Sequence, residues 1–511
     1  MKKVLKVLFS RLMVVALLMA IQVTLLVFLI MKLSTSFIYL YALFGVVSLA
    51  VVFFISGQRI NPSYKLAWTI PILIFPVFGG ALYILLRTSG ASKRFRKKIN
   101  DSHQNTLHLL KPKVDILDEL IEHDKSIANQ SRYMAKNAFF PAYKNTVTKY
   151  FQSGEKFYDS LVEELKKAKH FIFIESFIIR EGEMWNTILQ ILEEKVHQGV
   201  EVRVMYDDAG CVTSLPYKYY EKLREKGINC FVFNPFTPLI EIRMNHRDHR
   251  KIIVIDGYIS YTGGINLADE YINAFEKYGH WKDAAILVKG EASWNLTVMF
   301  LQLWGYISNT HEEYDRYRPD TYHPEPFESD GYVQPFGDSP IDNEPVGENT
   351  YLNMIGRARD YIYLFTPYLI IDHEMVTALM LAAKSGVDVR IVTPHVPDKW
   401  YVFLVTQSYY SVLIEAGVKI FEYTPGFLHS KVSVSDDVVA TVGSINLDYR
   451  SLYFHFECSV WLYKTQSVAA IKEDFMVTFK KCHEVTLEEC RQVSLFKRIL
   501  RSLLRLFAPL M

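Results

Sequence analysis

Two similar stretches decide the fold of this 511-residue chain: NHRDHRKIIVIDGYISYTGGIN at residues 245–266 and HSKVSVSDDVVATVGSIN at residues 429–446. Each contains the spacing H-x-K-x4-D and ends in small residues followed by Ile-Asn. Each centre is a run of β-forming residues, which is typical of a buried strand. Basic residues directly before such a strand are costly to bury unless they have partners or a function. The recurrence of the pattern indicates an internal duplication.

The sequence around the two motifs repeats as well. Strands are predicted at Ala168–Ile179 and Val200–Asp208, with a helix between them, and again at Ala358–Ile371 and Val387–His395, with a helix between them. Strands that alternate with helices indicate α/β sheets whose faces are covered by helices. We therefore predict an α/β fold of two homologous halves packed about a pseudo-two-fold axis.

Composition changes along the chain predict the remaining organisation. The stretch around residues 312–350 is rich in Glu, Asp, Pro and Gly, which is typical of a loop. The predicted regions are a membrane anchor at 1–98, a helical linker at 99–140, the first half at 141–311, an acidic loop linker at 312–344, the second half at 345–492 and a basic amphipathic helix at 493–511.

The N-terminal region is both basic and apolar. The first 100 residues contain 13 of the 57 lysines and arginines and none of the 55 acidic residues, so the rest carries a net charge of −11. Three uncharged apolar runs, Leu12–Met31, Phe37–Ser56 and Leu66–Leu86, are each long enough to cross about 30 Å of hydrocarbon. The third contains Pro71 and Pro76, so a kinked or re-entrant segment is an alternative.

Basic clusters lie before the first apolar run and after the third. If two of the runs span the membrane, both clusters can lie in the cytoplasm, as the positive-inside rule requires. If three runs span, the clusters lie on opposite faces, and only one of them can satisfy the rule. The larger cluster adjoins the body. We predict a multi-pass protein of the cell membrane, with two or three spans and a cytoplasmic body.

The C-terminal stretch LFKRILRSLLRLFAPL, residues 495–510, predicts an amphipathic helix. Its basic stripe favours a position in an anionic lipid interface. The alternative is a helix whose apolar face docks on the body. The apolar stripe is Phe496, Ile499, Leu500, Leu503 and Phe507, and the basic stripe is Arg498, Arg501 and Arg505.

Five cysteines, with no C-x-x-C pair among them, exclude a disulfide framework and a zinc site by spacing. Unpaired thiols in a reducing compartment are the expected state.

Strand geometry separates the residues of each motif. Residues two apart point to the same face of a strand, so the histidine and lysine project together. The aspartate has the opposite parity, and in the first copy it opens an Asp-Gly turn. We expect it to hold the hairpin together, although it belongs to the motif. The candidate catalytic set is His249, Lys251, Asp256, His429, Lys431 and Asp436.

The motif residues suit a phosphodiester if the halves bring them together. The lysines, with Asn266 and Asn446 as candidate phosphate-binding residues, can hold the non-bridging oxygens. One imidazole can attack phosphorus, while the other protonates the leaving oxygen and later deprotonates the incoming hydroxyl. We predict no metal and no cofactor. Four small residues, Gly263, Gly264, Gly443 and Ser444, are expected to let the backbone approach a ligand.

Each histidine needs a carboxylate on its other ring nitrogen to fix the tautomer. Asp283 in HWKDAAI and Glu457 in FHFECSV lie on the next predicted strands and are the candidates for this supporting role.

The two motifs resemble the paired HKD motifs of the phospholipase D superfamily. The stretch NPSYKLAWTIPILIFPVFGGALYILL, residues 61–86, and the C-terminus ending in FAPLM resemble those of bacterial cardiolipin synthases. The resemblance implies transfer of a phosphatidyl group from one phosphatidylglycerol to another, giving cardiolipin and glycerol. It also implies that His249 is the nucleophile and His429 the acid and base. The apolar run at 12–31 departs from a two-span anchor.

Three alternatives remain at this stage. A phospholipase D-type hydrolase would differ only in letting water attack in the second step. A nuclease needs a basic groove, which the negative charge of the body argues against, so no nucleic acid is expected as a partner. A non-catalytic scaffold is disfavoured because both motifs are intact. The oligomeric state is not predicted.

Overall fold

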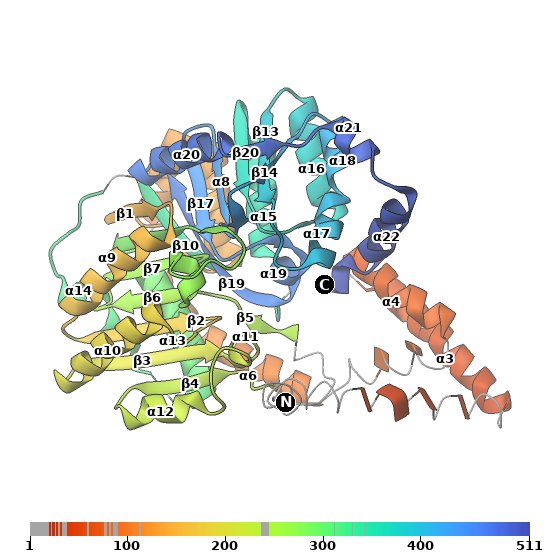
Figure 1. Cartoon of the computed structure of the whole chain (residues 1–511). Coiled ribbons are helices and arrows are strands. Elements are labelled where there is room, and N and C mark those ends of the chain that lie inside the picture. The colour runs from red at the N-terminus through yellow and green to blue at the C-terminus, as the bar shows by residue number, and fades with distance from the viewer. Residues whose placement is uncertain are drawn as a thin grey trace.

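The computed structural model describes residues 38–58, 61–75, 79–80, 83–84, 90–111, 114–236, 245–310, 312–329, 331–342 and 344–510, together with single residues between 20 and 32. The predicted apolar run Leu12–Met31 lies largely outside these residues. Two α/β halves form the body, and a helical hairpin stands away from it near the C-terminus (Figure 1).

The first half alternates strands and helices as predicted. Asp207 caps the short helix after β3, because its carboxylate accepts the N–H groups of Ala209 and Gly210. The elements are β1 (Thr146–Phe151), α9 (Gly154–Lys167), β2 (Phe171–Ser176), α10 (Glu183–His197), β3 (Glu201–Asp207), α11 (Asp208–Cys211), α12 (Tyr219–Glu225), β4 (Asn229–Phe233), β5 (Arg247–Asp248), β6 (Ile252–Ile255), β7 (Ile259–Gly263), η3 (Asp269–Ile272), β8 (His280–Lys282), β9 (Ala285–Gly290) and α13 (Ser293–Ser308).

The second half repeats this order. Its elements are β10 (Tyr332–Asp338), α15 (Val346–Arg357), β11 (Tyr361–Phe365), β12 (Leu369–Ile370), α16 (His373–Lys384), β13 (Asp388–Pro394), α17 (Trp400–Gln407), α18 (Tyr410–Glu415), β14 (Lys419–Tyr423), β15 (Gly426–Leu428), β16 (Val432–Ser435), β17 (Val439–Gly443), β18 (Leu447–Asp448), α19 (Tyr449–Tyr453), β19 (His455–Tyr463), α20 (Gln466–Phe479), β20 (Cys482–Glu484), α21 (Leu487–Arg491), α22 (Leu495–Leu506) and η5 (Ala508–Leu510).

The two sheets have the same strand order. The first runs β1-β9-β7-β6-β2-β3-β4, and the second runs β10-β19-β17-β16-β11-β13-β14 with β20 added at the far edge. The motif strands β6 and β16 are antiparallel to β2 and β11, which pair in parallel with β3 and β13. Strands β2 and β11 are buried along their whole length, as expected where helices cover both faces. The predicted duplication is confirmed.

Two short parallel ladders join the halves. Strand β5 pairs with β19, with Arg247 opposite His455, and β15 pairs with β8, with Leu428 opposite Lys282. Each ladder leads directly into a motif: His249 follows β5, and His429 follows β15. One helix of each half also packs on the first strand of the other half, α13 on β10 and α20 on β1. Each motif histidine is therefore positioned by backbone pairing with the opposite half.

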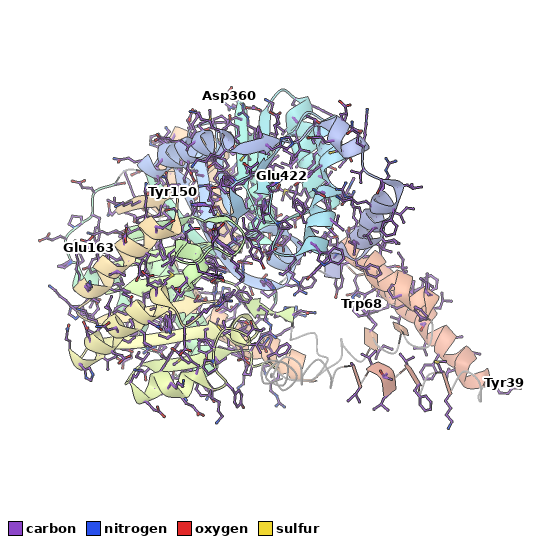
Figure 2. All side chains as sticks on the ribbon, viewed as in Figure 1. Tyr39, Trp68, Tyr150, Glu163, Asp360 and Glu422 are labelled. Carbon is purple, nitrogen blue, oxygen red and sulfur yellow. The ribbon has the colours of Figure 1, made fainter. Side chains whose placement is uncertain are left out.

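Side chains at the junction reinforce this exchange. Tyr150 on β1, labelled in Figure 2, donates its hydroxyl hydrogen to Asp474 on α20 at 2.7 Å. Lys282 on β8 forms a buried ion pair with the same carboxylate at 2.8 Å. The hydrophobic core likewise runs on from α13 into the second sheet. The halves thus share one interior.

The stretch 312–344, predicted as an acidic loop linker, contains secondary structure. Strand β10 lies inside this stretch, as do the short helices η4 (Tyr314–Tyr317) and α14 (Pro319–Tyr322). Pro335 and the flanking acidic residues hide the strand pattern. A proline is tolerated there because β10 is the edge strand of its sheet.

The N-terminal hairpin consists of α3 (Ile38–Ser56) and α4 (Pro62–Ile74). Val51, Ile55 and Ile72 are buried between the two helices, while many other apolar side chains are exposed, among them Tyr39 at the far end of α3 (Figure 2). The third apolar run is interrupted, since α4 contains Pro71 and ends at Ile74. No helix among the described residues is both long and apolar enough to cross a membrane. Asn61 ties the hairpin to the body, because its amide donates to Asp372 at 2.8 Å.

Helices occupy the predicted linker at 99–140, and the first of them begins before residue 99. This helix, α6 (Gly90–Thr106), packs on α13, and Arg96 donates to the carbonyl of Ile341 at 2.9 Å. Arg94, Arg96, Lys97 and Lys98, which follow the third apolar run, therefore belong to the body. Helices α7 (Val114–His123) and α8 (Lys125–Asn137) follow.

The C-terminal helix α22 docks by the side opposite to the apolar stripe. Arg501 donates to Gln407, and the guanidinium of Arg505 lies 4.2 Å from the ring centroid of Tyr409. Phe496, Ile499, Leu503 and Phe507 remain 44–78 % exposed. The alternative in which the apolar stripe packs on the body is therefore wrong.

Candidate active site

His249 is held by a carboxylate from the other half. Its Nδ1 lies 2.9 Å and 3.1 Å from the two carboxylate oxygens of Glu457, on β19. Its backbone N–H donates to the carbonyl of Phe456 at 2.9 Å, continuing the β5–β19 ladder. Both side chains are buried. Because Nδ1 faces the carboxylate, Nε2 is the nitrogen left for chemistry.

His429 repeats this arrangement with the roles of the halves reversed. Its Nδ1 lies 2.7 Å from Oδ2 of Asp283, just beyond β8, and its backbone N–H donates to the carbonyl of Lys282 at 2.7 Å. Asp283 and Glu457 are the carboxylates predicted from the sequence, and each supports the histidine of the opposite motif. One site is thus assembled from both halves.

The motif lysines occupy equivalent positions. Lys251 donates to the carbonyl of His249, and Lys431 donates to the carbonyl of His429. Burial lowers the pKa of Lys251 to about 8 and that of Lys431 to about 7. The charge of Lys251 further lowers the pKa values of Lys431 and His429, so the cationic groups of the two halves face one another.

Both histidines are neutral at physiological pH. Burial lowers the pKa of His249 to about 3 and that of His429 to about 4, and the neighbouring lysines act in the same direction. Burial would raise the pKa of Glu457, but His249, His455 and Lys251 together outweigh burial, so the pKa lies below its ordinary value. The same balance, with His429 as partner, lowers the pKa of Asp283. Each pair is therefore a neutral imidazole beside a carboxylate.

Asp256 and Asp436 lie away from the histidines, at the far ends of β6 and β16. The carboxylate of Asp256 accepts the backbone N–H groups of residues 169–171 at 2.7–2.9 Å. Asp436 accepts those of residues 359–361 at 3.0 Å. Their inclusion in the catalytic set is corrected: each aspartate fastens its hairpin to the start of the neighbouring strand, β2 or β11.

The two asparagines differ in their contacts. The amide of Asn266 accepts the N–H of Ile178 at 3.0 Å and donates to the hydroxyl of Tyr271 at 2.6 Å, so one amide hydrogen remains for a substrate. Asn446 is 5 % exposed, and its Oδ1 has no hydrogen-bond partner. Their role as phosphate-binding residues stays a prediction, and only Asn446 has its acceptor free.

The small residues allow close packing of the protein against itself. A Cβ on Gly263 or Gly443 would come within 2.4 Å of the carbonyl oxygen of Ala284 or Cys458. A Cβ on Gly264 would come within 2.1 Å of the Asp283 carboxylate. These positions need small residues to seat the neighbouring strand and the supporting carboxylate, and the expected approach to a ligand stays a prediction.

Sequence reasoning missed the residues that support the carboxylates. Ser451 donates to Glu457 at 2.7 Å, and Ser444 donates to its other oxygen. The motif residue Arg250 forms buried ion pairs with Glu175 at 2.7 Å and Asp248 at 3.1 Å. These partners are distant in the sequence or carry no pattern of their own.

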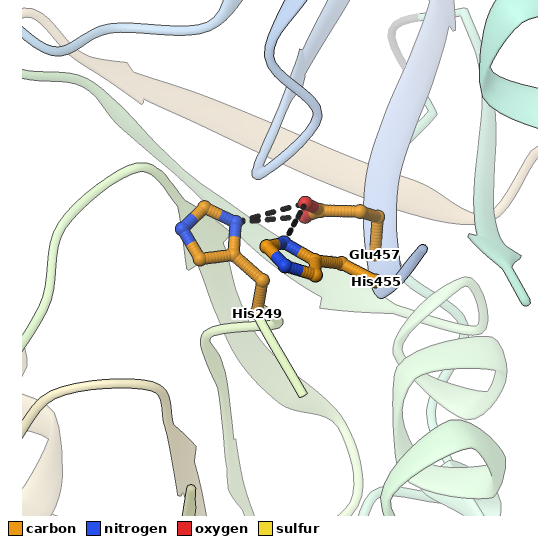
Figure 3. Close-up of side chains that lie close together, drawn as sticks. All are labelled: His249, His455 and Glu457. Atoms are coloured by element: carbon orange, nitrogen blue, oxygen red, sulfur yellow. Dashed lines mark hydrogen bonds and ion pairs between the residues drawn. The ribbon is translucent and has the colours of Figure 1, made fainter. Parts of the chain in front are cut away.

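The neighbours of the two histidines are not equivalent. The His455 ring centroid lies 5.6 Å from that of His249, and the Glu457 carboxylate faces both rings (Figure 3). Trp281 stands in the corresponding place beside His429, at 5.5 Å. Among the described residues, His249, His455 and Glu457 form a group whose possible ligand atoms lie within 4.8 Å of one another. Strand parity puts His455 on the same face as Glu457, so His455 could have been found from the sequence.

The duplicated fold and its paired histidine–carboxylate sites define a two-motif protein of the phospholipase D class. The family described as "Cardiolipin synthase, PLD-like domain" matches residues 161–304 and 351–478, and the "Phospholipase D-nuclease N-terminal" family matches residues 38–87. The chain belongs to the cardiolipin synthase family of this superfamily, and it is an enzyme.

Individual relatives agree with this assignment. A cardiolipin synthase of Geobacillus thermodenitrificans is 35 % identical over 468 residues, covering 90 % of this chain and 91 % of the relative. An uncharacterized protein of Streptococcus mutans is 42 % identical over 460 residues, covering 90 % and 99 %. The crystal structure of a Haemophilus influenzae phosphatidylserine synthase matches with a TM-score of 0.55 at 15 % identity, covering 75 % of this chain and 98 % of that one. This last likeness shows the fold.

Proposed function

We propose that this enzyme is a membrane phosphatidyltransferase that makes cardiolipin and glycerol from two molecules of phosphatidylglycerol through a phosphohistidine intermediate. The observation that carries the proposal is the crossed pairing of His249 with Glu457 and of His429 with Asp283. Two neutral imidazoles fixed in this way can divide the roles of nucleophile and proton carrier. Relatives named cardiolipin synthase support the choice of substrate.

In the first step, Nε2 of His249 attacks phosphorus of one phosphatidylglycerol. The bond from phosphorus to the glycerol oxygen breaks, and a proton from Nε2 of protonated His429 completes free glycerol. Lys251 and Lys431 hold the non-bridging oxygens while charge builds on them. Glu457 stabilises the positive charge that develops on the His249 ring as the new bond forms.

In the second step, the primary hydroxyl of another phosphatidylglycerol attacks the phosphohistidine. His429, now neutral, takes the hydroxyl proton, and the bond from phosphorus to Nε2 breaks. The product is cardiolipin, and both histidines return to their starting forms. Water in place of the hydroxyl would give phosphatidic acid, so exclusion of water distinguishes the synthase from a hydrolase.

Substrate binding supplies the protonated His429 that the first step needs. Without substrate, burial and the charge of Lys431 lower the pKa of His429 to about 4. A phosphodiester anion seated between the lysines offsets their charge and so raises the pKa of this histidine. Proton uptake is then coupled to substrate binding, with no metal or cofactor involved.

The membrane is the expected location because the substrates are lipids and the exposed apolar surfaces cluster. The α3–α4 hairpin and the outer stripe of α22 lie on the same side of the body, around the C-terminus (Figure 1). Contact of both with lipid would bring the second half close to the bilayer. A multi-pass anchor and a cytoplasmic body remain part of this proposal.

The test is a product assay on the purified protein. Phosphatidylglycerol vesicles are supplied in the presence of EDTA, and lipids and free glycerol are quantified. Cardiolipin and glycerol in equal amounts are expected. Phosphatidic acid as the main lipid product would instead identify a hydrolase, and loss of activity with EDTA would contradict a metal-free mechanism.

His249→Ala and His429→Ala provide the specificity controls for this assay. Each should lower turnover by about 10³-fold or more, because each removes a group that forms or breaks a bond in both steps. His395→Ala is the matched control, since this exposed histidine is also paired with a glutamate, Glu422, at 2.9 Å. Near-normal activity of either motif variant would contradict the two-histidine mechanism.

A further inference from the structure

His455 has no role in the transfer mechanism, yet it is held in the wall of the site. Its side chain is 10 % exposed, and neither ring nitrogen has a hydrogen-bond partner. The nearest charged atom to Nδ1 is Oε1 of Glu457, at 3.8 Å. A buried imidazole with both nitrogens unsatisfied is costly, which points to a ligand that the site accepts.

The spacing of this group suits a metal ion. In a tetrahedral zinc site with bonds of about 2.1 Å, neighbouring ligand atoms lie about 3.4 Å apart. Oε1 of Glu457 lies 2.9 Å from Nδ1 of His249 and 3.8 Å from Nδ1 of His455, on either side of this value. Two imidazoles and a carboxylate are also a common ligand set for zinc with one open position.

The second half of the site provides an internal comparison. The carbonyl of Phe456 accepts the backbone N–H of His249, and that of Lys282 accepts the backbone N–H of His429. His455 precedes Phe456 and Trp281 precedes Lys282, so these two residues occupy equivalent positions in the two halves. Trp281 packs on His429 at nearly the same distance but offers no metal ligand. Only one of the two duplicated positions therefore has the third ligand.

We propose that His249, His455 and Glu457 form an inhibitory binding site for a divalent transition-metal ion of the zinc class. Ser444 and Ser451 hold the carboxylate, as supporting hydrogen bonds do in metal sites. The metal site is argued from the observed side-chain positions alone, whereas its inhibitory effect rests on the proposed role of His249 as the nucleophile, whichever lipid is the substrate.

Inhibition follows from the chemistry of the imidazole ring. In the metal-free protein, the single ring proton of His249 lies on Nδ1, facing Glu457, and the Nε2 lone pair is free. A metal ion that takes the Nδ1 lone pair moves this proton to Nε2, so no proton is gained or lost. Nε2 then has no lone pair with which to attack phosphorus. The bound ion also coordinates Glu457, whose carboxylate then no longer stabilises the His249 ring.

Binding is tested directly with Co²⁺, whose visible absorption reports coordination by nitrogen and oxygen ligands. The full-length protein in detergent, without substrate, is expected to bind one equivalent with a tetrahedral-type spectrum, and Zn²⁺ should displace it. His455→Asn and His455→Trp should each weaken this binding by at least about 10-fold, the second by reproducing the arrangement beside His429. His483→Asn, which alters an exposed pair with Glu489, should bind as the wild type does.

Turnover supplies the second readout. For each protein, the turnover rate in Zn²⁺ is divided by the rate of the same protein in EDTA. The wild type should lose at least about 10-fold of its rate in Zn²⁺ and regain it in EDTA, whereas both His455 variants should keep a ratio near one. Equal Co²⁺ affinity in wild type and both His455 variants, or no bound Co²⁺ in the wild type, would overturn the proposal. Failure to make cardiolipin would affect the proposed function alone, because the Co²⁺ measurement uses no lipid substrate.

Discussion

The environments of His249 and His429 are related by duplication but are not copies of each other. Each imidazole is buried, uses Nδ1 to meet a carboxylate from the opposite half, and has its own lysine two residues later. Around His429 the carboxylate is the shorter Asp283, and the ring is packed by Tyr271, Trp281 and Phe427.

Around His249 the surroundings are more polar. The longer Glu457 accepts two serine hydroxyls, and His455 takes the place of the tryptophan. The shared features are those that neutral, oriented imidazoles require. The differing features surround the same chemistry without taking part in it. The comparison therefore separates what the transfer reaction needs from what each half has acquired for itself.

The supporting carboxylates should show the largest effects and the closest similarity between the halves. Glu457→Gln and Asp283→Asn should each lower kcat by about 10²–10⁴-fold, because the amide no longer fixes the tautomer or stabilises the charged ring. Steady-state glycerol release measures this. Glu484→Gln and Asp360→Asn, which alter exposed carboxylates, serve as matched controls. A normal rate in one of the two site variants would mean that only one pair works as described.

The lysines should set the alkaline limit of activity, and here the halves should differ. A lowered pKa means that each lysine is charged below that pKa and loses its charge above it, near pH 7 for Lys431 and pH 8 for Lys251. Since kcat/KM reports the free enzyme, it should fall as pH rises through this range. Lys431→Arg should move the limit towards pH 8, because arginine stays charged.

The acid limit is expected near pH 3, where the ring of His249 gains a proton and loses the lone pair that attacks phosphorus. A pH profile of kcat/KM for wild type and Lys431→Arg checks both limits. Identical alkaline limbs in the two proteins would rule out titration of this lysine.

The motif aspartates should affect stability more than catalysis. Asp256→Asn should lower the free energy of unfolding by about 2–4 kcal/mol, because three N–H groups, of which that of Phe171 is buried, lose a charged acceptor. Asp436→Asn should cost less, about 1–2 kcal/mol, since Asp436 is only half-buried. Denaturant unfolding measures both, with Asp437→Asn as the exposed neighbour control. A large loss of kcat in folded Asp256→Asn protein would return this residue to the catalytic set.

The smallest effect is expected from a feature that only the second half has. Phe496→Ser with Leu503→Ser removes exposed apolar area from α22 and should raise KM for vesicle phosphatidylglycerol about two- to tenfold, leaving kcat near normal. The α3–α4 hairpin limits the effect by providing a second apolar surface. Phe275→Ser, on an exposed loop of the first half, is the control. An unchanged KM would argue against lipid contact by α22.

Much of the fold was predictable because local patterns carry it. Runs of β-forming residues and helical periodicity located most elements of both halves, and the duplication strengthened each assignment. Strand β10 was not predicted because a proline and acidic neighbours mask its pattern, and these residues are tolerated only because β10 lies at the edge of its sheet. The side of α22 that docks on the body could not be predicted, because amphipathicity does not show which side contacts protein and which contacts lipid.

The site was predictable in composition but not in connectivity. Strand parity correctly separated His249 and Lys251 from Asp256. The pairing of His249 with Glu457 spans 208 residues and depends on the β5–β19 ladder, which has no local sequence signal. His455 was accessible to the same parity argument as Glu457, and its importance emerged only from the contrast with Trp281.

The central claim is that each imidazole donates its Nδ1 proton to a carboxylate of the opposite half. Histidine NMR of protein labelled with ¹⁵N in its 15 histidines tests this directly, with signals assigned from the His249→Ala and His429→Ala variants. Two neutral Nδ1–H tautomers are expected at pH 7. Of the two motif histidines, Glu457→Gln should change only the signal of His249, and Asp283→Asn only that of His429. Pairing within each half, or protons on Nε2 in the metal-free protein, would contradict the account.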